Sequence, residues 1–343
     1  MKALTLEAYG KFSYGDAPDP EIGDSDVQIE VKACGICGSD VHGMDGSTGR
    51  RRPPIIMGHE ASGVVAKVGS GVSGWKTGDR VTFDSTTYCG QCLYCDQGLV
   101  NLCENRQVIG VSCEEYRRHG AFAEKVVIPQ LGICAIPDKV SFEQAALAEP
   151  VSIALHAVNR LPIQGGETAV VVGTGMIGLF LVQSLKAAGC SRVFAVDLVE
   201  DKLALAKELG ADEALVPGQD DICSVVQDAT EGEGAHFSVE AVGVTDTVGL
   251  AIEVLRKGGS TCLVGNLAPE VNFPLQSVVT RELSVYGSCA SAGEYPHALQ
   301  AVAEGKIKVD PIISAVGDLK DGAEWFARLA DNREGLLKVV LRP

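Results

Sequence analysis

Four cysteines at short spacing form the first pattern in the sequence that could do chemistry. They follow the spacing C-x2-C-x2-C-x7-C and are Cys89, Cys92, Cys95 and Cys103. Four thiolates so close along the chain suit the tetrahedral coordination of zinc, and a site closed by four thiolates keeps no position open for a substrate. We therefore expect a structural zinc ion here. The alternative is a set of buried or redox-active cysteines.

A second set of possible metal ligands is spread over the first 150 residues. It consists of Cys37, the pair His59 and Glu60, and Glu149. One thiolate, one imidazole and one or two carboxylates can leave a coordination position open, which is the arrangement of a catalytic zinc ion that acts as a Lewis acid on a substrate oxygen. From spacing alone, an unrelated cysteine and histidine are an open alternative, and Cys34 with Cys37 could form a redox pair.

A glycine-rich segment, GTGMIG, follows a short apolar run at residues 168–172. Its glycines, Gly173, Gly175 and Gly178, enclose Met176 and Ile177 in the pattern GxGxxG. Between a strand and a helix this pattern indicates a dinucleotide site: the first glycine makes a tight turn, the second lets the backbone approach the pyrophosphate, and the third lets helix and strand pack closely. The N-terminus of the following helix favours phosphate groups.

An acidic residue lies 19 positions after the last of these glycines, at the end of an apolar run at residues 192–196. It is Asp197. A carboxylate at this point would bind both ribose hydroxyls and repel the 2′-phosphate of NADP, so the sequence favours NAD. Lys202 is close enough along the chain to soften that repulsion.

The elements that would position these residues differ between the two parts of the chain. The first 150 residues suggest short strands separated by turns, typical of a small β-barrel or sandwich. From about residue 150, apolar strands alternate with helices, which indicates a parallel sheet. The predicted strands are 27–32, 63–69, 79–83, 123–128, 168–172, 192–196, 236–239, 260–264 and 336–341, and the predicted helices are 177–188, 200–209, 296–303 and 321–329.

Composition limits the classes of protein and partner. A length of 343 residues suggests two domains, and 46% apolar with 22% charged residues argues against disorder. The net charge, 29 − 45 = −16, opposes binding to nucleic acid or to anionic membranes. An uncharged run at 168–185 is explained by the strand and helix around GxGxxG, so we expect no membrane span. The first residues do not resemble a signal peptide, so we expect a cytoplasmic protein.

Several motifs in their order along the chain closely resemble the zinc-dependent medium-chain dehydrogenases. They are Cys37-Gly38-Ser39-Asp40-Val41-His42, Gly58-His59-Glu60, Gly78-Asp79-Arg80-Val81 and the four-cysteine spacing. The resemblance covers essentially the whole chain. Within that family, Glu149-Pro150 with His156 is most similar to the polyol (sorbitol-type) and threonine dehydrogenase branch.

The resemblance implies roles for the residues of the second metal site. Cys37 and His59 would bind zinc, and Glu60 and Glu149 would compete for the third protein position. Asp40 would accept a hydrogen bond from the far nitrogen of His59 and so fix its tautomer.

The resemblance also implies a proton path and a nicotinamide pocket. Ser39 would touch the substrate hydroxyl, and His42 would complete a relay to solvent through the cofactor ribose. Gly243 and Gly265 resemble loops over the nicotinamide, with ordinary turn glycines as the alternative. The run Arg50-Arg51-Arg52 could meet an anionic substrate group, although such a run is usually solvated surface.

The fold implied is α/β, with a GroES-like β-rich catalytic domain (1–150 and 288–343) and a Rossmann domain (151–287). The activity implied is NAD-dependent oxidation of a secondary alcohol, a polyol or sugar alcohol, to a ketone by a homotetramer or dimer with two zinc ions per chain. Residues 287–291 hold no arginine, which argues against sorbitol itself. Alternatives are a threonine-type, diol or polyol-phosphate dehydrogenase and, in another class, a non-catalytic dinucleotide sensor.

Overall fold

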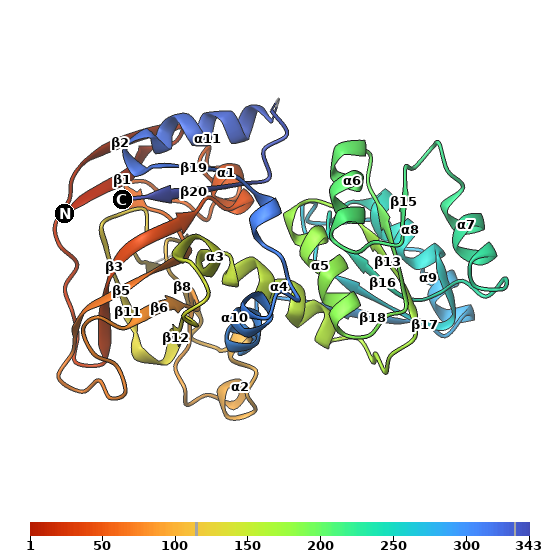
Figure 1. The fold of residues 1–343 in the computed structure, drawn as a ribbon, viewed down its shortest axis with the longest axis horizontal. Coiled ribbons are helices and arrows are strands. Elements are labelled where there is room, and N and C mark those ends of the chain that lie inside the picture. Colours follow the sequence, from red (N-terminus) through yellow and green to blue (C-terminus); the bar gives the residue numbers. More distant parts are fainter. Residues whose placement is uncertain (114–115, 333) are drawn as a thin grey trace. The chain divides into compact units, whose positions relative to one another are not determined.

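The computed structural model describes residues 1–113, 116–332 and 334–343. They form two compact units (Figure 1). Unit 1 comprises Met1–Glu149, Tyr295–Ala303 and Val309–Pro343, and unit 2 comprises Pro150–Glu294 and Glu304–Lys308. The division falls within helix α4 (Ala148–Asn159). As predicted, the chain combines a β-rich unit with a unit built on a parallel sheet.

The main sheet of unit 1 has the order β12-β6-β5-β3-β20-β19, with β11 also paired to β3. Its strands are β3 (Asp26–Gly35), β5 (Glu60–Val68), β6 (Arg80–Phe83), β11 (Lys125–Pro129), β12 (Ile133–Ala135), β19 (Ile313–Asp318) and β20 (Lys338–Arg342). Strand β20 comes from the C-terminal end of the chain and pairs with β3, Val340 opposite Gly35. Figure 1 shows this blue strand beside the red-orange N-terminal strands.

Smaller sheets and short helices complete unit 1. The other strands are β1 (Lys2–Ala8), β2 (Lys11–Asp16), β4 (Ile55–Ile56), β7 (Thr86–Thr87), β8 (Gln107–Val108), β9 (Ser112–Cys113) and β10 (Tyr116–Arg117). The helices are α1 (Gly38–Gly43), α2 (Leu93–Asp96), α3 (Phe142–Ala146), α10 (Tyr295–Ala303) and α11 (Gly322–Asp331). The largest apolar core of the unit joins β1, β4 and α11 to the main sheet, and in it the rings of Phe122 and Phe326 meet edge to face with centroids 5.6 Å apart. A second cluster joins α3 and α10.

The sheet of unit 2 is parallel, with the order β15-β14-β13-β16-β17-β18. Its strands are β13 (Thr168–Val172), β14 (Arg192–Val196), β15 (Glu213–Leu215), β16 (Ala235–Glu240), β17 (Leu255–Leu263) and β18 (Ser284–Gly287). Its helices are α5 (Met176–Ala187), α6 (Glu200–Glu208), α7 (Ile222–Asp228), α8 (Thr245–Glu253) and α9 (Leu275–Thr280). Strand β13 is buried along its whole length, as a central strand covered on both faces must be.

Helices cover both faces of this sheet. Val170 and Val172 of β13 share a core cluster with residues of α7 and α8. Val171 points the other way, toward Gly178 of α5. The uncharged run at 168–185 is therefore divided between β13 and α5. Among the described residues, no helix has the length and apolar character needed to cross a membrane.

Candidate active site

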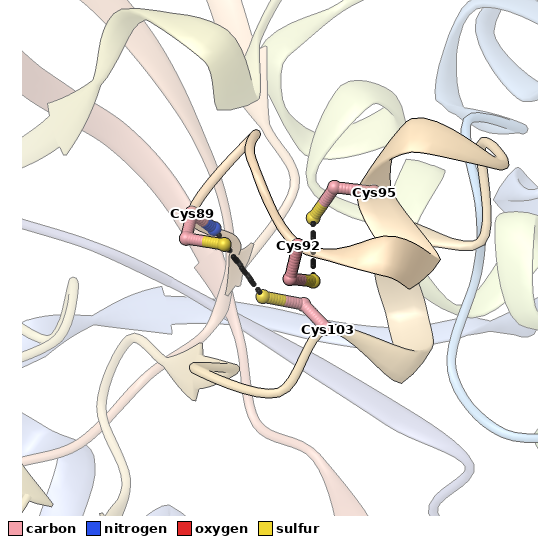
Figure 2. Close-up of side chains that lie close together, drawn as sticks. All are labelled: Cys89, Cys92, Cys95 and Cys103. Carbon is pink, nitrogen blue, oxygen red and sulfur yellow. Dashed lines mark hydrogen bonds between the residues drawn. The ribbon is translucent and has the colours of Figure 1, made fainter.

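The four predicted cysteine ligands converge in unit 1. The sulfur atoms of Cys89, Cys92, Cys95 and Cys103 all lie within 4.8 Å of one another. Figure 2 shows the four side chains facing one another, with Cys95 on the short helix α2. The Sγ–Sγ distances are 3.6 Å for Cys89 to Cys103 and 3.5 Å for Cys92 to Cys95. Tetrahedral coordination with bonds of about 2.3 Å requires sulfur atoms about 3.8 Å apart, so the cluster fits a structural zinc ion.

Backbone donors of this loop support thiolates at Cys92 and Cys103, whereas burial and the neighbouring Cys92 raise the pKa of Cys95 to about 11. Hydrogen bonds from the N–H groups of Cys95 and Glu104 lower the pKa of the Cys92 thiol to about 6. The backbone N–H groups of Cys89 and Asn105 both donate to Sγ of Cys103, each at 3.3 Å. Because zinc binds the thiolate rather than the thiol, these donors lower the cost of forming the site.

The second candidate site is built where two paired strands of unit 1 come together. Cys37 follows β3 and caps α1, its sulfur accepting from the N–H of Ser39. His59 precedes β5, and Glu60 begins it opposite Gly35 of β3. This pairing brings Cys37, His59 and Glu60 together, with one ligand atom of each within 4.8 Å of the others.

The donor set of this second group suits a metal cation. Oε1 of Glu60 is buried and has no hydrogen-bond partner, and Nδ1 of His59 faces Asp40, which leaves Nε2 as the ring nitrogen for a metal. Burial alone would lower the pKa of His59, but Asp40 and Cys37 raise it well above the usual value. The surroundings therefore stabilise a positive charge between a thiol, an imidazole and a carboxylate oxygen. A zinc ion has that charge and prefers those ligand types.

Glu149 lies beside this group rather than within it. Its side chain is partly buried at the start of α4. Burial, with the nearby Glu60 carboxylate, raises the pKa of Glu149 to about 7, although His59 acts in the opposite direction. The three clustered ligand atoms belong to Cys37, His59 and Glu60, so in this arrangement Glu60 is the nearer of the two predicted competitors.

A buried lysine holds the other oxygen of Glu60. Nζ of Lys338, on β20, lies 2.5 Å from Oε2 of Glu60 and 2.9 Å from the carbonyl oxygen of Ile36. The side chains of Lys338 and Glu60 are 1% and 0% exposed. The pair spans β3 at Gly35, where any Cβ would overlap Oε2 of Glu60. Glycine at position 35 is therefore needed for the pair to form.

Asp40 lies where the family resemblance expects it, but it has a partner that the sequence did not reveal. Its Oδ2 is 3.4 Å from Nδ1 of His59 without forming a hydrogen bond. Its Oδ1 accepts from both Nε and Nη2 of Arg51. Arg51 is 3% exposed, so this residue is not part of a solvated surface, and its contact with an anionic substrate stays untested. Burial would raise the pKa of Asp40, yet His59 and Arg51 hold it well below its usual range.

The two residues of the expected proton path lie on α1. Ser39 is exposed, and its Oγ lies 3.3 Å from Sγ of Cys37. His42 is exposed in the last turn of the helix. Residues three positions apart lie on one side of a helix, so both groups can face the same solvent region.

The GxGxxG segment has the geometry of a phosphate-binding turn in unit 2. Gly173 has a φ of 92°, and a Cβ on Gly178 would overlap the carbonyl oxygen of Gly173. Nothing lies within 4 Å of a Cβ built on Gly175, the residue that caps α5. The first and third glycines are thus required by the fold, whereas the second leaves open space at the helix N-terminus, which begins at Met176 and Ile177.

Asp197 follows β14 and supports this turn. Its Oδ2 accepts from the N–H of Thr174 at 2.7 Å, and its Oδ1 accepts from the N–H of Val199 at 3.0 Å. These bonds fix the carboxylate at the C-terminal edge of the sheet, next to the glycine-rich turn. Lys202 lies in α6 and is partly buried.

Gly243 and Gly265 belong to two loops that touch. A Cβ on either residue would overlap the backbone of the other loop. The Glu240 carboxylate supports the first loop by accepting from the N–H groups of Val242 and Gly243, at 2.8 and 2.7 Å. The close approach of the two loops accounts for both glycines.

Sequence reasoning missed three residues of the second site: Gly35, Arg51 and Lys338. Arg51 was hidden in a run of three arginines, which looks like surface. Lys338 did carry a signal, because it is the single charged residue between Leu336 and Leu341 in a strand predicted to be apolar. A lysine in such a strand needs a buried partner.

Two family models match the chain. Residues 23–138 match the model described as the alcohol dehydrogenase GroES-like domain, and residues 177–304 match the zinc-binding dehydrogenase model. The first falls in unit 1, and most of the second falls in unit 2.

Two curated relatives and a solved structure are similar over nearly the whole chain. The D-arabitol-phosphate dehydrogenase of Enterococcus avium is 34% identical, over 99% of this chain and 97% of the relative. The D-xylulose reductase A of Aspergillus oryzae is 33% identical, over 94% of this chain and 92% of the relative. A structure from Sinorhizobium meliloti 1021, solved with NADP bound, is 32% identical, covers 100% of this chain and 99% of that one, and has a TM-score of 0.91.

Proposed function

Because the chain belongs to the zinc-dependent medium-chain dehydrogenase family, in its polyol branch, we propose that it oxidises a secondary alcohol of a polyol or sugar alcohol to the ketone with NAD. It is a zinc-type alcohol or polyol oxidoreductase. The observation that carries the proposal is the group of Cys37, His59 and Glu60, whose ligand atoms lie within 4.8 Å while Oε1 of Glu60 has no protein partner. Residues 1–150 and 288–343 would form the catalytic domain, and residues 151–287 the dinucleotide-binding domain.

Two bound groups would supply the chemistry that side chains cannot. Cys37 and His59, with Glu60 or Glu149, would hold a zinc ion that polarises the substrate hydroxyl, and the GxGxxG turn would hold a nicotinamide that accepts hydride. A second zinc ion, held by the four-cysteine cluster, would have a structural role.

The chain's own residues would bind, orient and move the proton. Oγ of Ser39, next to Cys37, would accept the proton from the substrate hydroxyl as it gives up its own hydrogen to the proton path, and the exposed imidazole of His42 would release a proton to solvent at the end of that path. Asp197, held by Thr174, would bind the cofactor ribose and repel a 2′-phosphate, which supports NAD as the cofactor.

The direct test is NADH formation at 340 nm over a panel of alcohols, before and after treatment with a chelator. The panel contains ribitol, xylitol, galactitol, sorbitol, butane-2,3-diol, threonine and phosphorylated polyols. The proposal is supported by activity on a polyol that disappears with the chelator and in the variant Cys37→Ser. The control is Cys34→Ala, which should keep the activity because Cys34 is a buried cysteine outside the ligand group. Activity on threonine or the diol alone would favour that alternative. NAD binding without any turnover would favour a sensor.

A phosphorylated polyol is a second candidate substrate, favoured by arginines on two neighbouring loops. Arg50 and Arg52 are exposed, and their backbone bonds to Ser112. Arg117, on β10, donates to the carbonyl oxygen of Pro53. If this face binds phosphate, the double variant Arg50→Ala/Arg52→Ala raises KM for polyol phosphates and leaves KM for neutral polyols unchanged. Equal effects on both substrates would remove this candidate.

We further propose a homotetramer, with a dimer as the alternative, in the cytoplasm. Strand β18 lies at the edge of its sheet, and Phe273, Leu275 and Val279 are exposed nearby in the sequence, which supports self-association. The eleven cysteines whose side chains the structure describes are all free thiols, which supports a reducing compartment. Light scattering coupled to gel filtration measures the oligomeric state.

A further inference from the structure

Arg51 is a buried arginine that contacts two residues of α1 with one guanidinium group. Nε and Nη2 donate to the same oxygen, Oδ1 of Asp40, at 2.9 and 2.8 Å. Nη2 also lies 3.2 Å from Oγ of Ser39. Nη1 donates to the carbonyl oxygen of Arg50 at 3.0 Å. Hydrogen bonds to the carboxylate, the hydroxyl and the carbonyl thus fix the orientation of the planar group.

Gly43, the last residue of α1, leaves space for the Arg51 side chain. A Cβ on Gly43 would come within 2.6 Å of Cγ of Arg51. Gly43 is itself buried, so a larger residue there could not turn toward solvent. The arginine therefore occupies space that the helix leaves for it, and any larger side chain at position 43 would displace the guanidinium.

At Asp40, the guanidinium controls which oxygen is left for the metal site. Oδ1 is taken by Arg51, while Oδ2 has no hydrogen-bond partner and lies 3.4 Å from Nδ1 of His59. Two donors on one oxygen resist rotation of the carboxylate about its Cβ–Cγ bond. Groups behind a metal-binding histidine set the orientation of its ring and its basicity.

At Ser39, the same guanidinium controls the direction of the hydroxyl hydrogen. A serine hydroxyl has one hydrogen and two acceptor lone pairs. Since Nη2 of Arg51 donates to Oγ, one lone pair is used, and only the second lone pair and the hydrogen remain for the substrate, the proton path and Sγ of Cys37, 3.3 Å away. The hydroxyl is then oriented at the place where the substrate oxygen would bind.

We infer that Arg51 is a positioning residue of the active site, which holds the Asp40 carboxylate behind His59 and the Ser39 hydroxyl beside Cys37 at the same time. The inference rests on the proposed function, and adds to it a residue that connects retention of the metal with transfer of the substrate proton.

The test compares two substitutions of Arg51 in the full chain. In Arg51→Gln, the metal of the second site is released to a chelator about 10- to 100-fold faster, as is typical for loss of a group behind a ligand. The absorption of the cobalt-substituted site shifts, and kcat on a neutral polyol falls with little change in KM. Arg51→Lys keeps the charge beside Asp40 but lacks the planar fork, so it restores metal retention and leaves kcat low.

A partly exposed arginine on α11 provides the matched control. Arg328 forms the same kind of fork, with Nε and Nη2 donating to Glu334 at 2.9 and 2.6 Å. Arg328→Gln removes a forked ion pair of unit 1 without touching the site. Metal release, the cobalt spectrum and kcat all stay at the values of the unmodified protein.

Arg51→Gln leaves the buried Asp40 carboxylate unpaired and so could prevent folding. The double variant Arg51→Gln/Asp40→Asn has no unpaired buried carboxylate, so it allows the same measurement in a folded protein. If Arg51 acts through Asp40, the double variant releases the metal at the rate of Asp40→Asn alone. The inference is overturned by additional faster release in the double variant, or by folded Arg51→Gln with unchanged metal release or unchanged kcat. Metal release and the cobalt spectrum need no substrate, so failure of the proposed activity would be seen separately.

Discussion

Replacing Lys338 by methionine should strongly destabilise unit 1, because it leaves the Glu60 carboxylate buried without its cation. Both side chains are at most 1% exposed, and Nζ lies 2.5 Å from Oε2. Removing one partner of a buried ion pair costs about 3–5 kcal/mol. The loss also removes the hydrogen bond to the carbonyl oxygen of Ile36. We therefore expect the free energy of unfolding of unit 1 to fall by about 3–5 kcal/mol.

The chain offers a fluorescence signal confined to this unit. Its two tryptophans, Trp75 and Trp325, both lie in unit 1 and pack against its core. Urea titrations followed by tryptophan emission, in the presence of a chelator, report unfolding of this unit without the contribution of bound metal. Lys320→Met is the control: Lys320 pairs with Asp318 at 2.8 Å, but both side chains are exposed (59% and 62%), so its loss should barely change the free energy of unfolding.

A double-mutant cycle separates the unpaired charge from lost packing. The variant Lys338→Met/Glu60→Gln carries no buried charge at the pair, so it should be more stable than Lys338→Met alone. Gly35→Ala keeps both charges but forces the carboxylate away from the lysine, and should lose stability as well. The reasoning is refuted if Lys338→Met costs no more than Lys320→Met, or if the double variant loses the sum of the two single effects.

Three further outcomes follow from the cofactor and zinc sites. Gly178→Ala should lower the free energy of unfolding by about 1–3 kcal/mol, because its Cβ overlaps the carbonyl oxygen of Gly173. Gly175→Ala should leave the free energy of unfolding unchanged and weaken NAD binding. Urea unfolding and NAD titration measure the two effects, and equal losses of stability would contradict the open space at Gly175. Asp197→Ser should raise kcat/KM for NADP relative to NAD by at least about tenfold, since two unit charges about 4 Å apart near a surface repel by about 4 kcal/mol; an unchanged ratio would exclude Asp197 from cofactor selection. Cys92→Ser should lose one equivalent of zinc by metal analysis while Cys223→Ser, in unit 2, loses none; full zinc content in the first would disprove coordination by Cys92.

The sequence predicted the parallel sheet of unit 2 most accurately. The expected strands 168–172 and 192–196 coincide with β13 and β14. Central strands of a parallel sheet are buried on both faces, so they are short, continuous apolar runs between turns and are easily located. Strand β17 is longer than its prediction, 260–264, because it extends back to Leu255 through a polar segment with an irregular register.

The metal-ligand types were predictable, whereas the residues that hold them were not. Cysteine, histidine and glutamate are recognised by chemistry and spacing, and the structure brings Cys37, His59 and Glu60 together through the pairing of β3 with β5. Arg51 and Lys338 act through burial, which depends on the whole fold. Lys338 is 278 residues from its partner, and no local pattern encodes a contact at that separation.

Asp40 and Glu60 have the same arrangement at the second site: one carboxylate oxygen is paired with a buried cationic side chain and the other is not. Oδ1 of Asp40 is paired with Arg51, while its Oδ2 faces His59. In the same way, Oε2 of Glu60 is paired with Lys338, while its Oε1 has no hydrogen-bond partner. Each buried cation thus neutralises its carboxylate while one oxygen remains for the site. A divalent ion bound with the Cys37 thiolate would then keep a net positive charge, which favours an ionised substrate hydroxyl.

Glu149 is the remaining group that can alter this balance. Burial and the nearby Glu60 carboxylate bring its pKa to about 7. With a metal bound, a protonated Glu149 would leave the positive charge of the site intact, whereas an ionised Glu149 would reduce that charge. Glu60, by contrast, is held in place by Lys338 and keeps its Oε1 for the site.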